Sequence, residues 1–127
     1  MAIYGFTQLT DCQVTDNRGK IGGGSYVGET GSLTLQDSVV RNNIAAFGGG
    51  IAVQGVLTTY RISMIGNEAF VGGGVYNDGI CTLTQTTISN NVARASKFVF
   101  VGGGLFNIGT ATFRNQTIVR DNRLESN

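Results

Sequence analysis

Two carboxylates and one arginine are the residues whose types and spacing come closest to supporting chemistry in this chain. Asp11 and Asp37 occupy matching places in two successive segments, and Arg61 occupies the same place in a third. If these segments stack as neighbouring β-strands, the two carboxylates lie roughly 5 Å apart. Such a pair beside an arginine can bind calcium or supply acid–base chemistry on a sugar. A solvated row, in which Arg61 offsets two like charges, is the alternative.

The residue types that are missing restrict the chemistry further. The 127-residue chain has no histidine, which excludes Ser-His-Asp and Cys-His catalysis and histidine metal sites. Its two cysteines, Cys12 and Cys81, are too few for a disulfide framework or a zinc site. The sequence also carries no motif for a nucleotide, a haem or a pigment. We therefore expect a protein that is not an enzyme and that binds no metal and no cofactor.

Charge and hydropathy limit the partners that the chain can take. Nine basic and eight acidic residues give a net charge of +1, which provides no strong attraction to nucleic acid. The longest apolar run, Phe98–Val101, is much too short to span a membrane. The partner that we expect is therefore another protein, within a larger assembly.

The elements that would position these residues are indicated by an internal repeat. Gly-Gly-Gly occurs at residues 22–24, 48–50, 72–74 and 102–104. A further glycine follows each triplet, at positions 31, 55, 79 and 109, and Gly5 supplies an earlier copy. The intervals between these glycines are 26, 24, 24 and 30 residues, so the chain consists of about five units of 24 residues.

Within each unit, apolar and polar residues alternate. The segments 33–35, 81–83 and 111–113 each place a threonine between two less polar residues, as expected for a strand with one buried face. The same residue types recur at one fixed offset per unit, which favours parallel stacking over hairpins. We therefore predict an all-β fold, in which residues 1–127 form one domain. The domain is a short right-handed parallel β-helix, or solenoid, of about five 24-residue coils.

One column of the repeat consists of asparagines. The residues at this offset are Asn17, Asn43, Asn67 and Asn91, and the spacing places Asp121 in the last unit. An asparagine side chain can cap backbone groups at a bend, and stacked amides can hydrogen-bond to one another. We therefore predict a structural asparagine ladder at a bend of the coil.

The longest interval contains an insertion. Six extra residues fall within 92–101, and an insertion in a solenoid leaves the stack as a loop on one face. This segment is first cationic and then apolar, which suits contact with a partner protein or with the surface of a membrane. The alternative is that its phenylalanines fold back over the coil. The residues that we expect to contact a partner are Arg94, Lys97, Phe98, Val99 and Phe100.

Two short motifs recur along nearly the whole chain. The first is Gly-Gly-Gly followed by an aliphatic residue, in 48–51, 72–75 and 102–105. The second is an apolar residue followed by x-x-Asn, in 14–17, 40–43, 64–67 and 88–91. Together they resemble the repeats of chlamydial-type polymorphic outer-membrane proteins, and those of the wider class of parallel β-helix repeat proteins. The former usually have phenylalanine where this chain has aliphatic residues or Met64 before x-x-Asn.

This resemblance implies a surface-exposed passenger domain with an adhesive or interaction role. We therefore expect a non-enzymatic structural or protein-interaction module, which is an adhesin-like passenger segment or an accessory subunit of a larger assembly. The same fold also carries polysaccharide lyases and hydrolases, because a fold does not fix a function. The alternative function is thus a carbohydrate-binding or carbohydrate-cleaving β-helix that uses Asp11, Asp37 and Arg61.

The sequence gives two opposing indications of location. The family resemblance implies the cell surface, whereas the segment that begins at Met1 lacks the pattern of a signal peptide. Two cysteines that are not expected to pair favour a reducing compartment. The location is therefore left open by the sequence.

Overall fold

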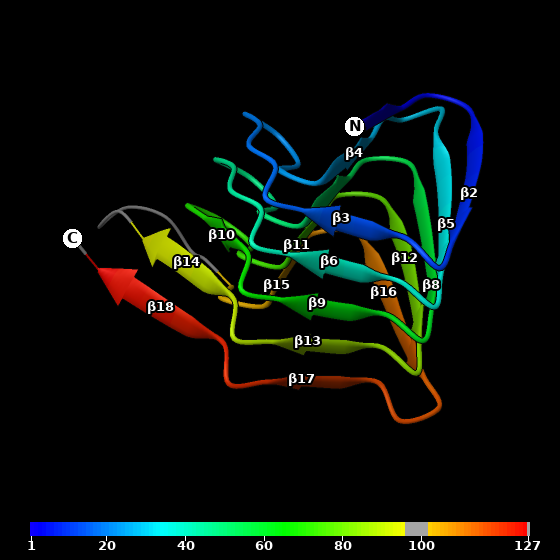
Figure 1. Cartoon of the computed structure of the whole chain (residues 1–127). Helices are drawn as coiled ribbons and strands as arrows, with labels where there is room; N and C mark the ends of the chain where they lie inside the picture. The colour runs from blue at the N-terminus through cyan, green and yellow to red at the C-terminus, as the bar shows by residue number, and fades with distance from the viewer. Residues whose placement is uncertain (96–101, 127) are drawn as a thin grey trace.

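The computed structural model describes residues 1–95 and 102–126, and every regular element in that part of the chain is a β-strand. Each turn of the chain adds one strand to successive sheets, so the strands stack in parallel along one axis (Figure 1). The result is a parallel β-solenoid of about four turns. This confirms the predicted fold class, with about one turn fewer than the repeat count indicated.

Over the described residues the strands form four parallel sheets, which we name A to D. Sheet A contains β1 (Ala2–Ile3), β4 (Ser25–Val27), β7 (Ile51–Val53), β11 (Val75–Asn77) and β15 (Leu105–Asn107). Sheet B contains β2 (Phe6–Thr10), β5 (Ser32–Gln36), β8 (Val56–Tyr60), β12 (Ile80–Thr84) and β16 (Thr110–Arg114). Sheet C contains β3 (Gln13–Thr15), β6 (Val39–Arg41), β9 (Ser63–Ile65), β13 (Thr87–Ser89) and β17 (Ile118–Arg120). Sheet D contains β10 (Glu68–Ala69), β14 (Val92–Ala95) and β18 (Arg123–Ser126).

The hydrophobic core runs along the axis of the solenoid. In sheet B the inward residues of successive turns stack on one another, as Leu33, Leu57 and Cys81 do, and all three are fully buried. Burial raises the pKa of the Cys81 thiol to about 12, so this cysteine is a core residue rather than a reactive one. The alternation that predicted strands therefore separates the core from the outer faces.

The chain turns its corners with residues in the left-handed backbone conformation. The first corner of successive turns has Asp11, Asp37, Arg61, Gln85 and Asn115, all with φ between 47° and 54°. The second corner has Asp16, Asn42, Gly66, Asn90 and Asp121, with φ between 55° and 69°. Asparagine, aspartate and glycine tolerate this conformation better than other residues. The recurring acidic and amide residues at these offsets therefore have a conformational reason to be there.

The asparagine ladder lies just after the second corner. The backbone N–H and the Nδ2 of each asparagine donate to the Oδ1 of the asparagine in the next turn, at 2.9–3.0 Å. Asn43, Asn67 and Asn91 are fully buried. Each also donates through Nδ2 to a backbone carbonyl in the sheet C strand of the preceding turn, as Asn67 does to Val40 in β6. The ladder thus satisfies buried backbone groups at every turn.

In the last turn the ladder continues through Asn122 and not through Asp121, where the repeat spacing placed it. Two consecutive residues, Asn115 and Gln116, have positive φ at the first corner of this turn. The extra residue shifts the register by one, so that Ile88 pairs with Val119. Asp121 instead occupies the left-handed position of the second corner.

The last turn leaves its inward residues exposed. Phe113 is 51% exposed and Leu124 is 56% exposed, whereas their aligned neighbours in the preceding turn, Leu83 and Ala93, are fully buried. The core therefore opens to solvent in the last turn of the described chain.

The insertion begins later than the sequence spacing suggested. Residues Val92–Ala95, which were expected to belong to the loop, form β14 and pair in parallel with β10 and β18. The rest of the expected loop, residues 96–101, lies outside the described part of the chain. In residues 1–95 and 102–126 there is no helix that could cross a membrane.

Candidate functional site

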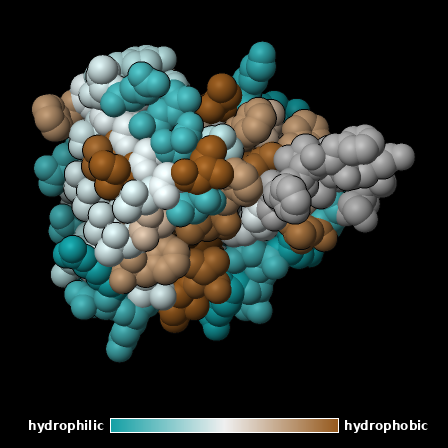
Figure 2. Space-filling view, turned by 180° about the vertical axis from the view of Figure 1, so that it is seen from behind, coloured by the Kyte–Doolittle hydropathy of each residue, from teal (hydrophilic) through white to brown (hydrophobic). Residues whose placement is uncertain are grey.

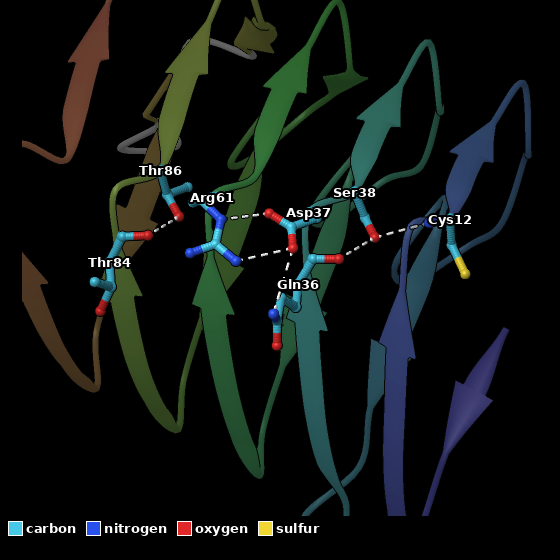
Figure 3. Close-up of polar contacts among 7 residues, drawn as sticks. All are labelled: Cys12, Gln36, Asp37, Ser38, Arg61, Thr84 and Thr86. Atoms are coloured by element: carbon cyan, nitrogen blue, oxygen red, sulfur yellow. Dashed lines mark hydrogen bonds and ion pairs between the residues drawn. The ribbon is translucent and has the colours of Figure 1, made fainter.

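The first candidate site is the corner between sheets B and C, where Asp37 and Arg61 face each other (Figure 3). The Nε and Nη2 of Arg61 donate to the two carboxylate oxygens of Asp37, and the Nη2–Oδ2 distance is 2.9 Å. Gln36 donates a further hydrogen bond to Oδ2 at 3.3 Å. The guanidinium carbon of Arg61 also lies 4.4 Å from the centre of the Tyr60 ring. Both oxygens of Asp37 are therefore occupied by neighbouring side chains.

This pairing affects the chemistry that the sequence suggested for Asp37. The hydrogen bond from Arg61 lowers the pKa of the carboxyl, so Asp37 stays ionised at neutral pH. A general acid needs a raised pKa, and a calcium ligand needs a free oxygen. Within the described residues, no hydrogen bond or ion pair joins Asp11 to Asp37 or Arg61. The geometry is that of an exposed ion pair that links two turns, and it adds no support to the carbohydrate hypothesis.

Hydroxyl groups fix the backbone behind this ion pair. The Oγ of Ser38 donates to the carbonyl of Gln36 at 2.7 Å and accepts the backbone N–H of Cys12 at 3.0 Å. Two turns further on, Thr86 donates in the same way to the carbonyl of Thr84 at 3.0 Å (Figure 3). This corner is therefore held by hydrogen bonds within and between turns.

The second candidate site is the predicted partner contact, of which the structure describes only Arg94. Arg94 lies in β14, where its Nε donates to Glu68 of β10. Its Nη1 lies 2.6 Å from Oε2 of Glu125 in β18. The side chain thus joins all three strands of sheet D. The other expected contacts lie outside the described residues: Lys97, Phe98, Val99 and Phe100.

A third site, which the sequence analysis missed, lies on the outer face of sheet A. The side chains come from sheet A and from the connections that precede it, and they form what we call the aromatic stripe: Ile21, Tyr26, Phe47, Tyr76 and Phe106. The rings of Tyr76 and Phe106 are stacked, with centroids 5.5 Å apart. Phe47 meets Tyr76 edge-on at 5.4 Å. Hydrophobic side chains gather along the middle of the rear face of the molecule (Figure 2).

The stripe contains a pocket of about 150 Å³. Ala52 of β7 lies at its floor and is only 1% exposed, and its side chain is much smaller than those of its aligned neighbours on the adjacent strands, Tyr26 and Tyr76. The phenol of Tyr26 donates to Oε1 of Gln54 at 2.5 Å. The residues that line the pocket are Ile21, Tyr26, Phe47, Ala52, Val53, Gln54 and Tyr76. All of them are uncharged, so the pocket suits a neutral group.

Two of the stripe residues are exposed although they are large and apolar. Ile21 is 45% exposed and Phe47 is 40% exposed. They precede successive glycine triplets, and the bridges between turns place them in one column, since Ile21 pairs with Phe47. The sequence did carry a signal for this site, which was the apolar residue before each triplet. It did not show that this residue faces outward.

The described residues include no group of three or more histidine, cysteine, aspartate or glutamate side chains that could hold a metal ion. Comparisons with known protein families, with characterised proteins and with solved structures find no match to this chain.

Proposed function

We propose that this chain is a non-enzymatic protein-interaction module, in which the solenoid presents the aromatic stripe to a partner protein. The observation that carries the proposal is the neutral pocket of about 150 Å³ on the outer face of sheet A, beside the exposed side chains of Ile21 and Phe47 in the connections that precede the sheet. Contiguous apolar surface of this kind marks interaction sites, and aromatic residues are enriched in them. The stacked strands beneath it form a rigid support.

The kind of module is a finer part of the proposal. An accessory subunit of a larger assembly and an adhesin-like passenger segment both use a solenoid as a scaffold for surface contacts. The passenger role is supported by the resemblance of the glycine-triplet and x-x-Asn motifs to the repeats of polymorphic outer-membrane proteins. The contact predicted at Lys97, Phe98, Val99 and Phe100 lies outside the described residues, and the proposal does not rest on it.

The experiment that tests this function is native mass spectrometry of the protein isolated gently from its source cells. We expect the wild-type chain to appear in a stoichiometric complex with another protein. The double variant Phe47→Ser, Tyr76→Ser should appear mainly as the free chain, because it removes the apolar centre of the stripe.

The matched control changes two exposed apolar residues on sheet B. Phe6 is 96% exposed and Ile80 is 52% exposed, so Phe6→Ser with Ile80→Ser removes apolar surface without touching the stripe. Circular dichroism establishes that both variants keep their β-structure. A complex that survives the stripe variant as well as it survives the control overturns the proposed function.

A further inference from the structure

We propose that the pocket over Ala52 receives a proline ring from a partner segment in the polyproline II conformation. This inference rests on the proposed function, since it names the chemistry of the partner that the aromatic stripe binds. The argument has three parts, which are the spacing of the stripe, its hydrogen-bonding groups and its lack of charge.

The spacing of the stripe follows from the alternation of small and large side chains. Outward positions on the first four strands of sheet A are Ala2, Tyr26, Ala52 and Tyr76, and the fifth strand carries a second large residue, Phe106. The small residues are two strands apart, which corresponds to about 9.6 Å along the axis. A polyproline II helix repeats every three residues, at about 9.3 Å. Side chains at i and i+3 of such a segment, running along the axis, therefore match the positions of Ala2 and Ala52, with the Tyr26 ring between them.

The polar groups of the pocket suit the backbone of such a segment. Polyproline II has no internal hydrogen bonds, so its carbonyl oxygens need outside donors. The Oε1 of Gln54 is occupied by the Tyr26 phenol, which leaves the Nε2 group of Gln54 to donate. Among the described residues, Nε2 of Gln54 has no hydrogen-bond partner. Proline brings no N–H of its own that would need an acceptor in the apolar pocket.

The lack of charge and the small number of polar groups distinguish proline from a sugar. A pyranose ring carries hydroxyl groups around its edge, and each loses hydrogen bonds to water on binding. The pocket offers only two phenols and one amide, of which the Tyr26 phenol and the Gln54 carbonyl already pair with each other. A proline ring is apolar and packs against aromatic faces without such a requirement. The lining therefore favours the proline segment.

The test is fluorescence anisotropy with the full chain and a labelled oligoproline peptide, beside a labelled glycine–serine peptide of equal length. We expect saturable binding of the oligoproline only. Ala52→Leu fills the pocket and should weaken binding at least about tenfold, since it removes the space for the ring. Gln54→Ala changes an exposed side chain and should weaken binding by about fivefold, the usual effect of one lost hydrogen bond. Ile80→Ser on sheet B should leave binding unchanged.

Three outcomes would overturn the inference. The first is that oligoproline does not bind the wild-type chain. The second is binding that Ala52→Leu and Gln54→Ala leave intact, which would place the peptide elsewhere. The third is that a neutral oligosaccharide binds with the same dependence on these two residues and oligoproline does not.

The two proposals can be told apart. If oligoproline does not bind while the Phe47→Ser, Tyr76→Ser variant still loses the cellular partner, only the inference about proline is contradicted. If that variant also retains the partner, the proposed function is contradicted as well.

Discussion

The asparagines between turns show how one side chain can serve the backbone of its neighbours. The Oδ1 of Asn67 accepts both the backbone N–H and the Nδ2 of Asn43, and its own Nδ2 donates to Val40 and Asn91. Replacing a buried residue of this kind leaves several polar groups without partners. A group left unsatisfied in this way costs about 1–3 kcal/mol.

We therefore predict that Asn67→Ala lowers the free energy of unfolding by about 3 kcal/mol, as measured by urea denaturation. Asn17→Ala is the matched control, because Asn17 donates to Asn43 and accepts no hydrogen bond from another asparagine of the described ladder. Its loss should be markedly smaller. Equal losses for the two variants would contradict the ladder as a source of stability.

The Asp37–Arg61 pair predicts a dependence of stability on pH. The main cause of this dependence is the hydrogen bond from Arg61, which lowers the pKa of Asp37 below its ordinary value of 3.8. A lowered pKa in the folded state stabilises the fold above the unfolded pKa, and this contribution is lost as the pH falls through the folded value. Asp37→Asn should therefore lower Tm at pH 6, and the difference from the wild type should disappear in strong acid.

Asp11→Asn provides the control for that experiment. Asp11 occupies the same left-handed corner position, with φ of 54°, but has no ion pair with Arg61 in the described structure. We expect its Tm to follow that of the wild type at both pH values. A shift of the same size and pH dependence in Asp11→Asn would show that general surface charge, and not the pair, is responsible. Because the pair is exposed, added salt should reduce the effect of Asp37→Asn.

At the scale of the strands and their connections, the glycine triplets set how closely successive turns approach. A Cβ built on Gly49 would lie 2.4 Å from the backbone oxygens of both Glu68 and Gly73. Backbone atoms on two sides leave no flexible side chain that could move away. The triplet therefore allows the connection before sheet A to pack directly on the next turn.

Gly49→Ala should accordingly destabilise the fold by on the order of 3 kcal/mol, or prevent folding. The matched variant is Gly5→Ala, since a Cβ on Gly5 would meet nothing within 4 Å. Differential scanning calorimetry of the two variants compares them directly. A Gly49→Ala protein as stable as Gly5→Ala would show that the turns are not in the tight contact described here.

The strands could be predicted from the sequence, whereas several details of their placement could not. The alternation of apolar and polar residues around Leu33 and the asparagine column that contains Asn43 both recur once in every turn. Such a repeat is visible in a single sequence. The backbone conformation at Asp37 has no such signature, because the same residue type suits both chemistry and a left-handed corner. The extra residue near Gln116 needs the pairing of Ile88 with Val119 to be detected.

The aromatic stripe escaped the sequence analysis for a related reason. Over the first four strands of sheet A its small and large residues, such as Ala52 and Tyr76, alternate with a period of two turns. A comparison of single units does not detect a pattern of that period. The apolar residue before each triplet does not by itself indicate whether the side chain faces the core or solvent. Only the register of sheet A places these side chains on one face.

At the scale of the whole molecule, stability should vary along the axis. Strands β8 and β9 pair on both sides and carry fully buried inward residues such as Leu57 and Met64. Strands β16 and β17 pair on one side only, and Phe113 and Val119 are 51% and 41% exposed. Local opening follows the burial and pairing of each segment.

Hydrogen exchange measured by mass spectrometry should therefore be faster in β16 and β17 than in β8 and β9. We expect a difference of at least about tenfold, which corresponds to about 1.4 kcal/mol of opening free energy. Each pair of strands belongs to the same two sheets, so the comparison isolates position along the axis. Uniform protection along the axis would contradict this account of the open last turn.

Site-specific photocrosslinking in the source cells tests the central claim most directly, that the aromatic stripe is where the module meets its partner. A photoreactive amino acid is placed at Phe47 in the stripe and, in a second variant, at Ile80 on sheet B. Our account predicts one defined adduct with another protein from position 47 and none from position 80. Adducts from position 80 alone, or none from either position, would contradict it.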